Sequence, residues 1–286
     1  MGVSQPRRAL LQTAPVLPQT PFSLTEHAPG LYLHRVDLPT YLPLCHHPDT
    51  LAFFLNMTQQ LAGQGLRVVH LWDDVVRQKP TIVASRLAAL RGESIRVPGR
   101  LTQVRRLDRA TAMDFLDENH LQAALPGKVR YGLFLPERYY RVLPPTYLAP
   151  LPPHDLLVAV ATFAQPRTQH RPTGPHRSAE LLRMASRLGL TVVGGLDKLL
   201  TTYLTNHPAN DLMTYADRDW GDGNSYRKVG FEVTGQTPPQ PFWLDLASNS
   251  RYTAIPPGAV TSQTGFIPVY NTGSFKFVRP HPWHRP

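Results

Sequence analysis

Proline is the feature that most limits the structures open to this chain, because 30 of its 286 residues are prolines. A proline inside a helix removes a backbone hydrogen bond and clashes with the preceding turn, and inside a central strand it removes a bond from the ladder. Long uninterrupted helices are therefore excluded, and many short elements joined by stiff loops are expected. Hydrophobic residues make up 42% of the chain, which is enough to build a core around such elements.

The apolar segments are short. The longest continuous one, 156–164, has the length of a strand and contains Thr162, whereas a membrane-spanning helix needs ~20 apolar residues. No apolar block precedes Pro15, so a secretory signal is not expected. The single cysteine, Cys45, excludes an intramolecular disulfide and a cysteine-based zinc cluster. We expect a cytoplasmic protein without a membrane partner, and the sequence does not indicate its oligomeric state.

The basic charge is carried almost entirely by arginine. The formal net charge is +10, and 25 of the 30 basic residues are arginines. A planar guanidinium group forms paired hydrogen bonds with phosphate groups and guanine edges, so the excess indicates nucleic acid as a partner. A GC-rich genome also favours arginine codons, and composition alone does not separate the two explanations. The two explanations can be separated only by where the arginines lie along the chain.

Arginines gather between residues 86 and 109, where seven of them stand against only Glu93 and Asp108. Such a run can follow a phosphate backbone, and each neutralised phosphate adds salt-dependent affinity. The alternative is a solvated linker between two domains. We predict that duplex DNA is bound, without much sequence preference, through five of these side chains. They are Arg91, Arg96, Arg100, Arg105 and Arg106.

The spacing of apolar residues divides the chain into four parts. Residues 1–30 are rich in proline and glutamine, show no period and predict a flexible arm. Residues 31–95 predict a small helix–strand–helix module, and residues 96–250 predict a larger domain of alternating strands and helices. Residues 251–286 are rich in turn residues and predict a tail with one last strand.

Within these parts, helical spacing and β-branched runs predict short elements. Gly63 and Gly65 are placed to end one helix, and Asp108 is placed to cap another. The expected helices are 50–65, 81–90, 109–119, 196–206 and 223–229. The expected strands are 66–72, 101–107, 129–135, 156–163, 179–185, 211–216, 231–233, 242–244 and 273–278. This order predicts an α/β (α+β) fold with a mixed central sheet flanked by helices.

Four stretches carry a family resemblance. They are residues 180–184 (ELLRM), 191–200 (TVVGGLDKLL), 213–219 (MTYADRD) and 223–231 (GNSYRKVGF). The segment that contains them, 100–245, resembles the C-terminal domain of phage and bacterial homing-endonuclease proteins. Those proteins join a nuclease similar to the very-short-patch-repair enzyme to an acetyltransferase-like module. The last two stretches are the most specific part of the resemblance.

Residues 70–86 resemble the last strand and helix of that nuclease. A Mg²⁺-dependent nuclease of this type also needs carboxylates from earlier strands to hold the metal. Three acids precede residue 65, and no strand pattern presents them together; they are Glu26, Asp37 and Asp49. Asp73 and Asp74 fit a helix start, where negative charge is favoured, better than a metal site. We therefore expect a nuclease remnant without a metal and without a self-sufficient cleavage centre.

The C-terminal half is also similar in element order to the GNAT acetyltransferase fold. In that fold, backbone N–H groups at a helix N-terminus bind the pyrophosphate of coenzyme A. Val193, Gly194 and Gly195 stand at this place. The family pattern has Arg or Gln where Thr191 stands and a small residue where Leu196 stands. The alternative is that the two glycines serve close packing of a helix on a strand.

The same resemblance gives two side chains a catalytic role. Tyr226 stands where many acetyltransferases have the tyrosine that protonates the thiolate, and a phenol with a pKa near 10 can donate that proton. Glu180 on the preceding strand would serve as the base through a water. The alternative is that Tyr226 is a packing residue and that Glu180 pairs with Arg183 or Arg218.

Two functions of different classes follow. The first is a nucleic-acid-associated protein related to mobile homing-endonuclease machinery, with a GNAT-like domain as scaffold or DNA-contact module and DNA as partner. The second is an N-acetyltransferase that uses acetyl-CoA as cofactor. The basic run at 86–109 favours the first, and the Gly194–Gly195 loop with Tyr226 favours the second.

Overall fold

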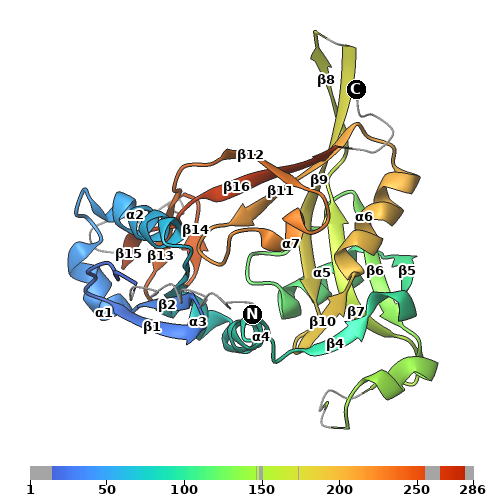
Figure 1. The fold of residues 1–286 in the computed structure, drawn as a ribbon, viewed down its shortest axis with the longest axis horizontal. Helices are drawn as coiled ribbons and strands as arrows, with labels where there is room; N and C mark the ends of the chain where they lie inside the picture. Colours follow the sequence, from blue (N-terminus) through green and yellow to red (C-terminus); the bar gives the residue numbers. More distant parts are fainter. Residues whose placement is uncertain (1–14, 146, 148–150, 173, 255–264, 281–286) are drawn as a thin grey trace, which may run out of the picture.

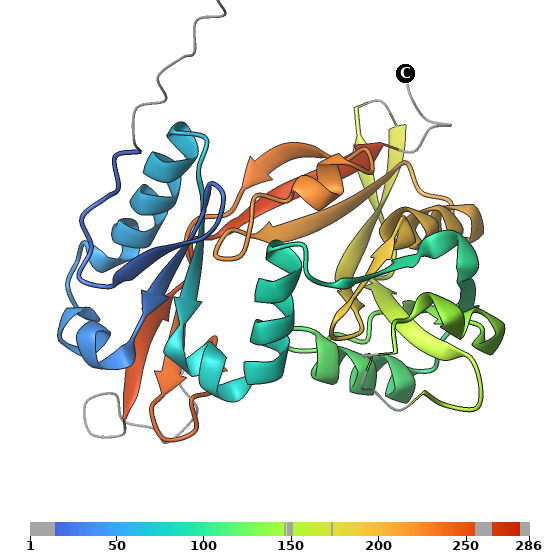
Figure 2. The ribbon, with the colours of Figure 1, turned by 60° about the horizontal axis from the view of Figure 1, so that its bottom comes forward.

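The computed structural model describes residues 15–145, 147, 151–172, 174–254 and 265–280. Figure 2 shows two lobes side by side, a smaller one built mainly from the N-terminal residues and a larger one around a long twisted sheet. No helix among the described residues is long and apolar enough to cross a membrane.

The larger lobe contains an eight-stranded sheet with the order β12-β16-β11-β9-β7-β6-β5, to which β8 adds as a partner of β9 (Figure 1). Its strands are β5 (Gln103–Arg106), β6 (Val129–Leu135), β7 (Leu156–Phe163), β8 (Arg167–Arg171), β9 (Gly174–Ser186), β11 (Asp211–Asp217), β12 (Glu232–Gln236) and β16 (Ser274–Pro280). Neighbouring strands are antiparallel except β9 and β11, which are parallel. The mixed α/β fold predicted from the sequence is confirmed.

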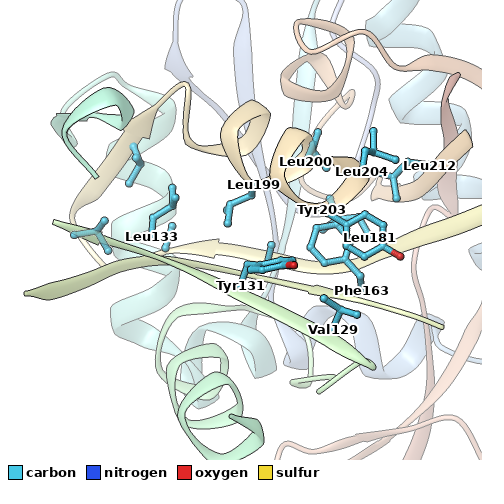
Figure 3. Packing of buried hydrophobic residues seen from close by; sticks show 14 of the residues in the cluster. Val129, Tyr131, Leu133, Phe163, Leu181, Leu199, Leu200, Tyr203, Leu204 and Leu212 are labelled. Carbon is cyan, nitrogen blue, oxygen red and sulfur yellow. The ribbon is translucent and has the colours of Figure 1, made fainter. Parts of the chain in front are cut away.

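Two helices cover the two faces of this sheet. Helix α6 (Gly195–Asn206) packs on one face, where the ring of Tyr203 stacks on that of Phe163 with centroids 4.0 Å apart (Figure 3). Helix α5 (Arg109–Asn119) packs on the other face through a cluster that includes Phe115 and Leu116. Because β7 is buried on both faces, its side chains divide between the two clusters.

The parallel strands β9 and β11 stay paired over only three positions. These run from Asp211 opposite Ser178 to Met213 opposite Glu180. Beyond Glu180, β9 continues toward Ser186 and bonds to β7, whereas β11 continues to Asp217 and bonds to β16. The sheet therefore opens between its two central strands, as the predicted GNAT-like order requires.

A small two-stranded parallel sheet leads into α6. Strand β4 (Ile95–Pro98) pairs with β10 (Leu190–Val193), and each is followed by a short turn into a helix. Gly194 adopts φ 76°, a left-handed conformation that strains residues with a side chain, at the N-cap of α6. The 3₁₀ helix η2 (Gly99–Leu101) follows β4. Neither β4 nor β10 was predicted.

The smaller lobe combines residues from both ends of the described chain. Its N-terminal elements are β1 (Ser23–Ala28), β2 (Leu31–Val36), α1 (Leu38–Tyr41), η1 (Leu42–Leu44), α2 (Thr50–Gly63), β3 (Arg67–Trp72) and α3 (Asp73–Gln78), with α4 (Pro80–Leu90) leading out of it. Its C-terminal elements are β13 (Pro241–Asp245), β14 (Arg251–Tyr252) and β15 (Phe266–Tyr270). Leu244, Ile267 and Val269 complete the hydrophobic cluster around Phe54 and Trp72.

This arrangement differs from the predicted organisation in three places. Strand β13 lies in the smaller lobe, although residues 241–245 fall inside the range 96–250 that was predicted as the larger domain. Strand β1 lies inside the range 1–30 that was predicted as a flexible arm, of which residues 1–14 lie outside the described structure. The range 251–286 was predicted as a turn-rich tail with one last strand; it supplies that strand as β16 and also contains β14 and β15, although 255–264 and 281–286 are not described. Strand β1 has no regular alternation of buried and exposed residues and β14 has only two residues, so neither carries the local pattern that predicts a strand.

A buried histidine pair joins β2, β3 and α2. The Nδ1 atoms of His34 and His70 are 2.9 Å apart, so one ring donates to the other. Their outer nitrogens contact the hydroxyl groups of Thr20 (2.7 Å) and Thr58 (2.8 Å). Both rings are almost fully buried, and burial lowers the pKa of His34 to about 4 and the pKa of His70 well below its usual value. The lobe therefore holds both rings neutral.

Candidate functional site at the junction of the two lobes

The glycine loop before α6 serves close packing. A side chain on Gly195 would place its Cβ 2.8 Å from the Val192 side chain and 2.9 Å from that of Leu133. A Cβ on Gly99 of η2 would lie 2.7 Å from the carbonyl oxygen of Val193. The backbone of η2 therefore lies directly against the backbone of Val193, Gly194 and Gly195.

Charged side chains of both signs surround this loop. Asp197 lies in the first turn of α6 and pairs with Arg279 at 3.2 Å. The ammonium group of Lys198 donates to the carbonyl oxygens of Gly99 and Thr102, so it is engaged in hydrogen bonds within the protein. Leu196 packs against the core. Val193 and Gly194 are exposed, and a Cβ on Gly194 would meet no atom within 4 Å. Pyrophosphate binding at Val193, Gly194 and Gly195 remains a prediction.

A polar cluster lies where β9 and β11 separate. We call it the junction cluster and define it by five side chains from five segments. They are Arg86 on α4, Gln122 in the loop after α5, Arg183 on β9, Asp217 on β11 and Tyr226 on α7 (Asn224–Arg227). The amide of Gln122 donates to the carboxylate of Asp217 at 3.1 Å. The guanidinium of Arg183 donates to the carbonyl oxygen of Ala123 at 3.0 Å, and that of Arg86 lies 5.2 Å from the ring centre of Trp220.

Arg86 is exposed to solvent and surrounded by protein at the same time. More than a third of the residue is accessible, yet desolvation by its surroundings lowers its pKa, with Asp217 and Tyr226 acting against that shift. Burial raises the pKa of Asp217, and Arg86 partly offsets this. A cation held in this way is accessible to a ligand and is weakly solvated.

The two predicted catalytic residues share one electrostatic neighbour. Burial raises the pKa of Glu180 and of Tyr226, and the charge of Arg183 acts against both shifts. The Tyr226 ring also packs against Phe231 and Phe277, with centroids 5.7 and 5.5 Å away. The structure therefore brings both residues to the junction cluster, with no hydrogen bond between them among the described contacts. Their catalytic role remains a prediction.

An ion pair joins two distant segments of the smaller lobe, and a backbone hydrogen bond joins this lobe to the loop after β11. The Asp74 carboxylate accepts two hydrogen bonds from Arg251, at 2.6 and 2.9 Å, and the Arg251 guanidinium lies 5.0 Å from the ring centre of Trp72. The backbone N–H of His70 donates to the carbonyl oxygen of Asp219 at 2.9 Å. Sequence reasoning missed Arg251, which stands 177 positions from its partner.

Asp73 and Asp74 occupy the first turn of α3, as the sequence predicted. Asp74 is engaged by Arg251, and Asp73 lies 3.5 Å from Arg35 and 3.7 Å from Arg77. Among the described residues, no group of three or more His, Cys, Asp or Glu side chains could hold a metal ion. These two carboxylates thus have arginine partners.

The predicted DNA-contact arginines divide into two kinds. Arg91 pairs with Glu93 through two contacts of 2.6 Å, and Arg105 pairs with Asp155 and lies over the ring of Phe134. The other three are exposed and, within the described part of the chain, form no ion pair. They are Arg96 on β4, Arg100 on η2 and Arg106 on the edge strand β5.

No protein-family model and no curated protein matches this chain. Among solved structures, it is similar to the NatC complex bound to Gag peptide and CoA at 10% identity, over 63% of this chain and 98% of that one, with a TM-score of 0.37. It is similar to a Bacillus subtilis acetyltransferase in complex with CoA at 11% identity, over 63% and 99%, with a TM-score of 0.34. It is similar to the KacTA–DNA complex at 12% identity, over 59% of this chain and 92% of that one, with a TM-score of 0.28. At TM-scores this low the similarity carries no argument about what this chain binds or catalyses.

Proposed function

We propose that this protein binds nucleic acid through its arginine-rich surface, with the central-sheet lobe as the scaffold. The observation that carries the proposal is the set of three exposed arginines without an ion-pair partner among the described residues: Arg96, Arg100 and Arg106. They lie on three elements that follow one another along the chain, β4, η2 and β5. A formal net charge of +10 adds a long-range attraction for a polyanion.

The relation to mobile homing-endonuclease machinery belongs to the same proposal. Its support is the set of sequence stretches that resemble those proteins, and the last two of them contribute Asp217 and Tyr226 to the junction cluster. In this proposal the GNAT-like lobe serves as a contact module and the N-terminal lobe as a nuclease remnant.

Acetyl transfer is the second candidate, favoured by the opening between β9 and β11 and by the placement of Tyr226 and Glu180 beside Arg183. The glycine loop weighs against it, since η2 packs against Val193 and Gly195 and Asp197 adds a negative charge to the first turn of α6. Titration of the protein with acetyl-CoA in a calorimeter separates the two candidates. We expect no heat of binding; a saturable heat would favour acetyl transfer and overturn our interpretation of the loop.

DNA binding is tested with a charge-reversal variant. Changing Arg96, Arg100 and Arg106 to Glu should weaken binding of a labelled DNA duplex at least ~100-fold, because each lost phosphate contact removes a salt-dependent part of the affinity. Fluorescence anisotropy at several salt concentrations should also show a log–log salt slope that is smaller by about three.

The matched control carries the same charge change at another exposed place. Lys128, just before β6, and Arg138 and Arg141, on the 3₁₀ helix η3 (Glu137–Val142), are exposed and lie on none of β4, η2 and β5. The triple variant Lys128→Glu, Arg138→Glu and Arg141→Glu should retain most of the affinity. If both triple variants weaken binding equally, the attraction is a property of the net charge and the proposed surface is wrong.

A further inference from the structure

A two-stranded ribbon projects from the central sheet. It consists of β8 and residues 174–178 of β9, and Figure 1 shows it extending well beyond the body of the molecule. Register is regular, from Arg167 opposite Ser178 to Arg171 opposite Gly174. Within the described residues β8 pairs only with β9, and β9 gains its next partner, β11, at Ser178. The outer part of the ribbon thus has no neighbouring strand.

The ribbon has no apolar side chain that could pack in a core. Its ten described residues are arginine, histidine, threonine, glutamine and serine, with one proline and one glycine, and contain no acid. All five residues of β8 are exposed. From Ala179 onward β9 becomes apolar and buried. An isolated two-stranded hairpin is only marginally stable in water, so packing does not account for this element.

Polar donors alternate over its two faces. Because successive side chains of a strand point to opposite sides, Arg167, Gln169 and Arg171 share one face, and His170 and Arg177 share the other. At the base, Asp211 accepts hydrogen bonds from His176 (2.6 Å) and Ser178 (2.5 Å). The nearest guanidinium to this carboxylate is that of Arg171, at 4.0 Å. Asp211 therefore binds the base of the ribbon and leaves most of the positive charge of the ribbon without a nearby carboxylate.

We propose that this ribbon enters the major groove of duplex DNA, an inference that rests on the proposed nucleic-acid binding. Two paired strands are ~4.8 Å apart and with their side chains fill a groove ~12 Å wide, whereas a minor groove ~6 Å wide does not admit them. Arginine and glutamine are the side chains that pair with guanine and adenine edges in that groove. The ribbon thus adds contacts to bases to the phosphate contacts proposed for the β4–β5 surface.

A cross-linking experiment tests where the ribbon lies. Cys45 is buried, so Gln169→Cys provides one accessible thiol at the middle of β8. Duplexes that carry a disulfide tether either in the major groove, on cytosine N4, or in the minor groove, on guanine N2, are incubated with this variant. We expect a mixed disulfide with the major-groove tether at a yield at least ~10-fold above that of the minor-groove tether. Glu118→Cys, exposed on α5, should react with neither.

An affinity measurement on the otherwise unchanged protein completes the test. Arg167→Ala, Arg171→Ala and Arg177→Ala together should weaken duplex binding by about 10- to 100-fold. Lys128→Ala, Arg138→Ala and Arg141→Ala, with the same charge change, should weaken it less than ~3-fold. Circular dichroism should show the same melting curve for all variants, because the replaced side chains are exposed.

The outcomes separate this inference from the proposed function. If the wild type binds duplex DNA but the ribbon variant binds equally well and Gln169→Cys gives no cross-link, the ribbon inference is wrong and DNA binding stands. A cross-link only with the minor-groove tether also overturns the inference. If the wild type binds no duplex at all, the proposed function fails first.

Discussion

Asp74→Ala should lower the free energy of unfolding by about 3 kcal/mol or more, because it leaves a buried guanidinium without its main partner. The Asp74 side chain is 1% exposed and accepts both hydrogen bonds from Arg251, whose side chain is 20% exposed. The neighbouring carboxylates of Asp217 and Asp219 also attract Arg251, but neither is hydrogen-bonded to it among the described contacts. Urea unfolding at pH 7.5, followed by circular dichroism, measures the loss.

Asp197→Ala is the matched control. Its carboxylate also pairs with an arginine, at 3.2 Å from Arg279, but the Asp197 side chain is 53% exposed. Exposed pairs of this kind contribute about 0–1 kcal/mol, so the control should differ little from the wild type. If Asp74→Ala destabilises the protein no more than Asp197→Ala does, the Asp74–Arg251 pair does not stabilise the smaller lobe. Replacing Asp74 and Arg251 together by Leu and Met should cost less than Asp74→Ala alone.

Acidification should destabilise the protein through the buried histidine pair. An unfolded histidine has a pKa of about 6.5, whereas burial lowers the pKa of His34 to about 4 and also lowers that of His70. Above pH 6.5 both rings are neutral in both states, and below it the unfolded chain binds protons that the folded lobe excludes. Stability is therefore fully present above the unfolded pKa and is lost as the pH falls toward the folded one. At pH 5 the loss from His34 is on the order of 2 kcal/mol, and His70 adds a loss of the same sign.

Other buried groups also change the size of this effect, His120 and Asp219 among them. Burial also lowers the pKa of His120 to about 4, which adds a loss of the same sign. Burial raises the pKa of Asp219 to about 7, so its unfavourable charge is relieved as the pH falls from 7 toward 4, which opposes the loss. The variant Asp219→Asn keeps an oxygen to accept from Thr272 and removes this titration. Its stability should therefore fall more steeply between pH 7 and 5.

Urea midpoints at pH 7.5 and 5.0 measure the net change, and NMR of the histidine rings identifies its source. The ring resonances of His34 and His70 should not titrate above pH 5. A titration of either ring near pH 6.5 would contradict the neutral, buried pair described for this lobe.

Elements with local signals could be predicted to within a residue or two. Helix α5 begins at Arg109 as expected, because Asp108 accepts a hydrogen bond from the backbone N–H of Thr111 at 2.8 Å, the interaction that an N-cap provides. Strands β6 and β7 match their predicted bounds because each is a run of β-formers between turns. Strand β4 had no such signal, since it has four residues, includes Arg96 and Pro98, and pairs with β10 more than 90 positions away.

In the candidate site, too, the residues with a local sequence signal could be predicted and those without one could not. Tyr226 and Glu180 were found because they lie in stretches that resemble a family, and both reach the junction cluster. The role of Arg86 depends on contacts between the lobes, and the pairing of Arg251 joins two segments of the smaller lobe that are far apart in the sequence. No local pattern reports either contact. The predicted arginine run overestimated the free charge, because Glu93 and Asp155 neutralise Arg91 and Arg105.

The path of the chain between β12 and β16 has a consequence for how this protein is made. After β12 the chain leaves the large sheet, adds β13 to β15 to the smaller lobe and returns as β16, which lies between β12 and β11. Until the segment after Phe266 has emerged from the ribosome, one lobe lacks part of its core and the other has a gap beside its central strand. Neither lobe can therefore complete its folding ahead of the other during synthesis, and both are finished by the same few residues.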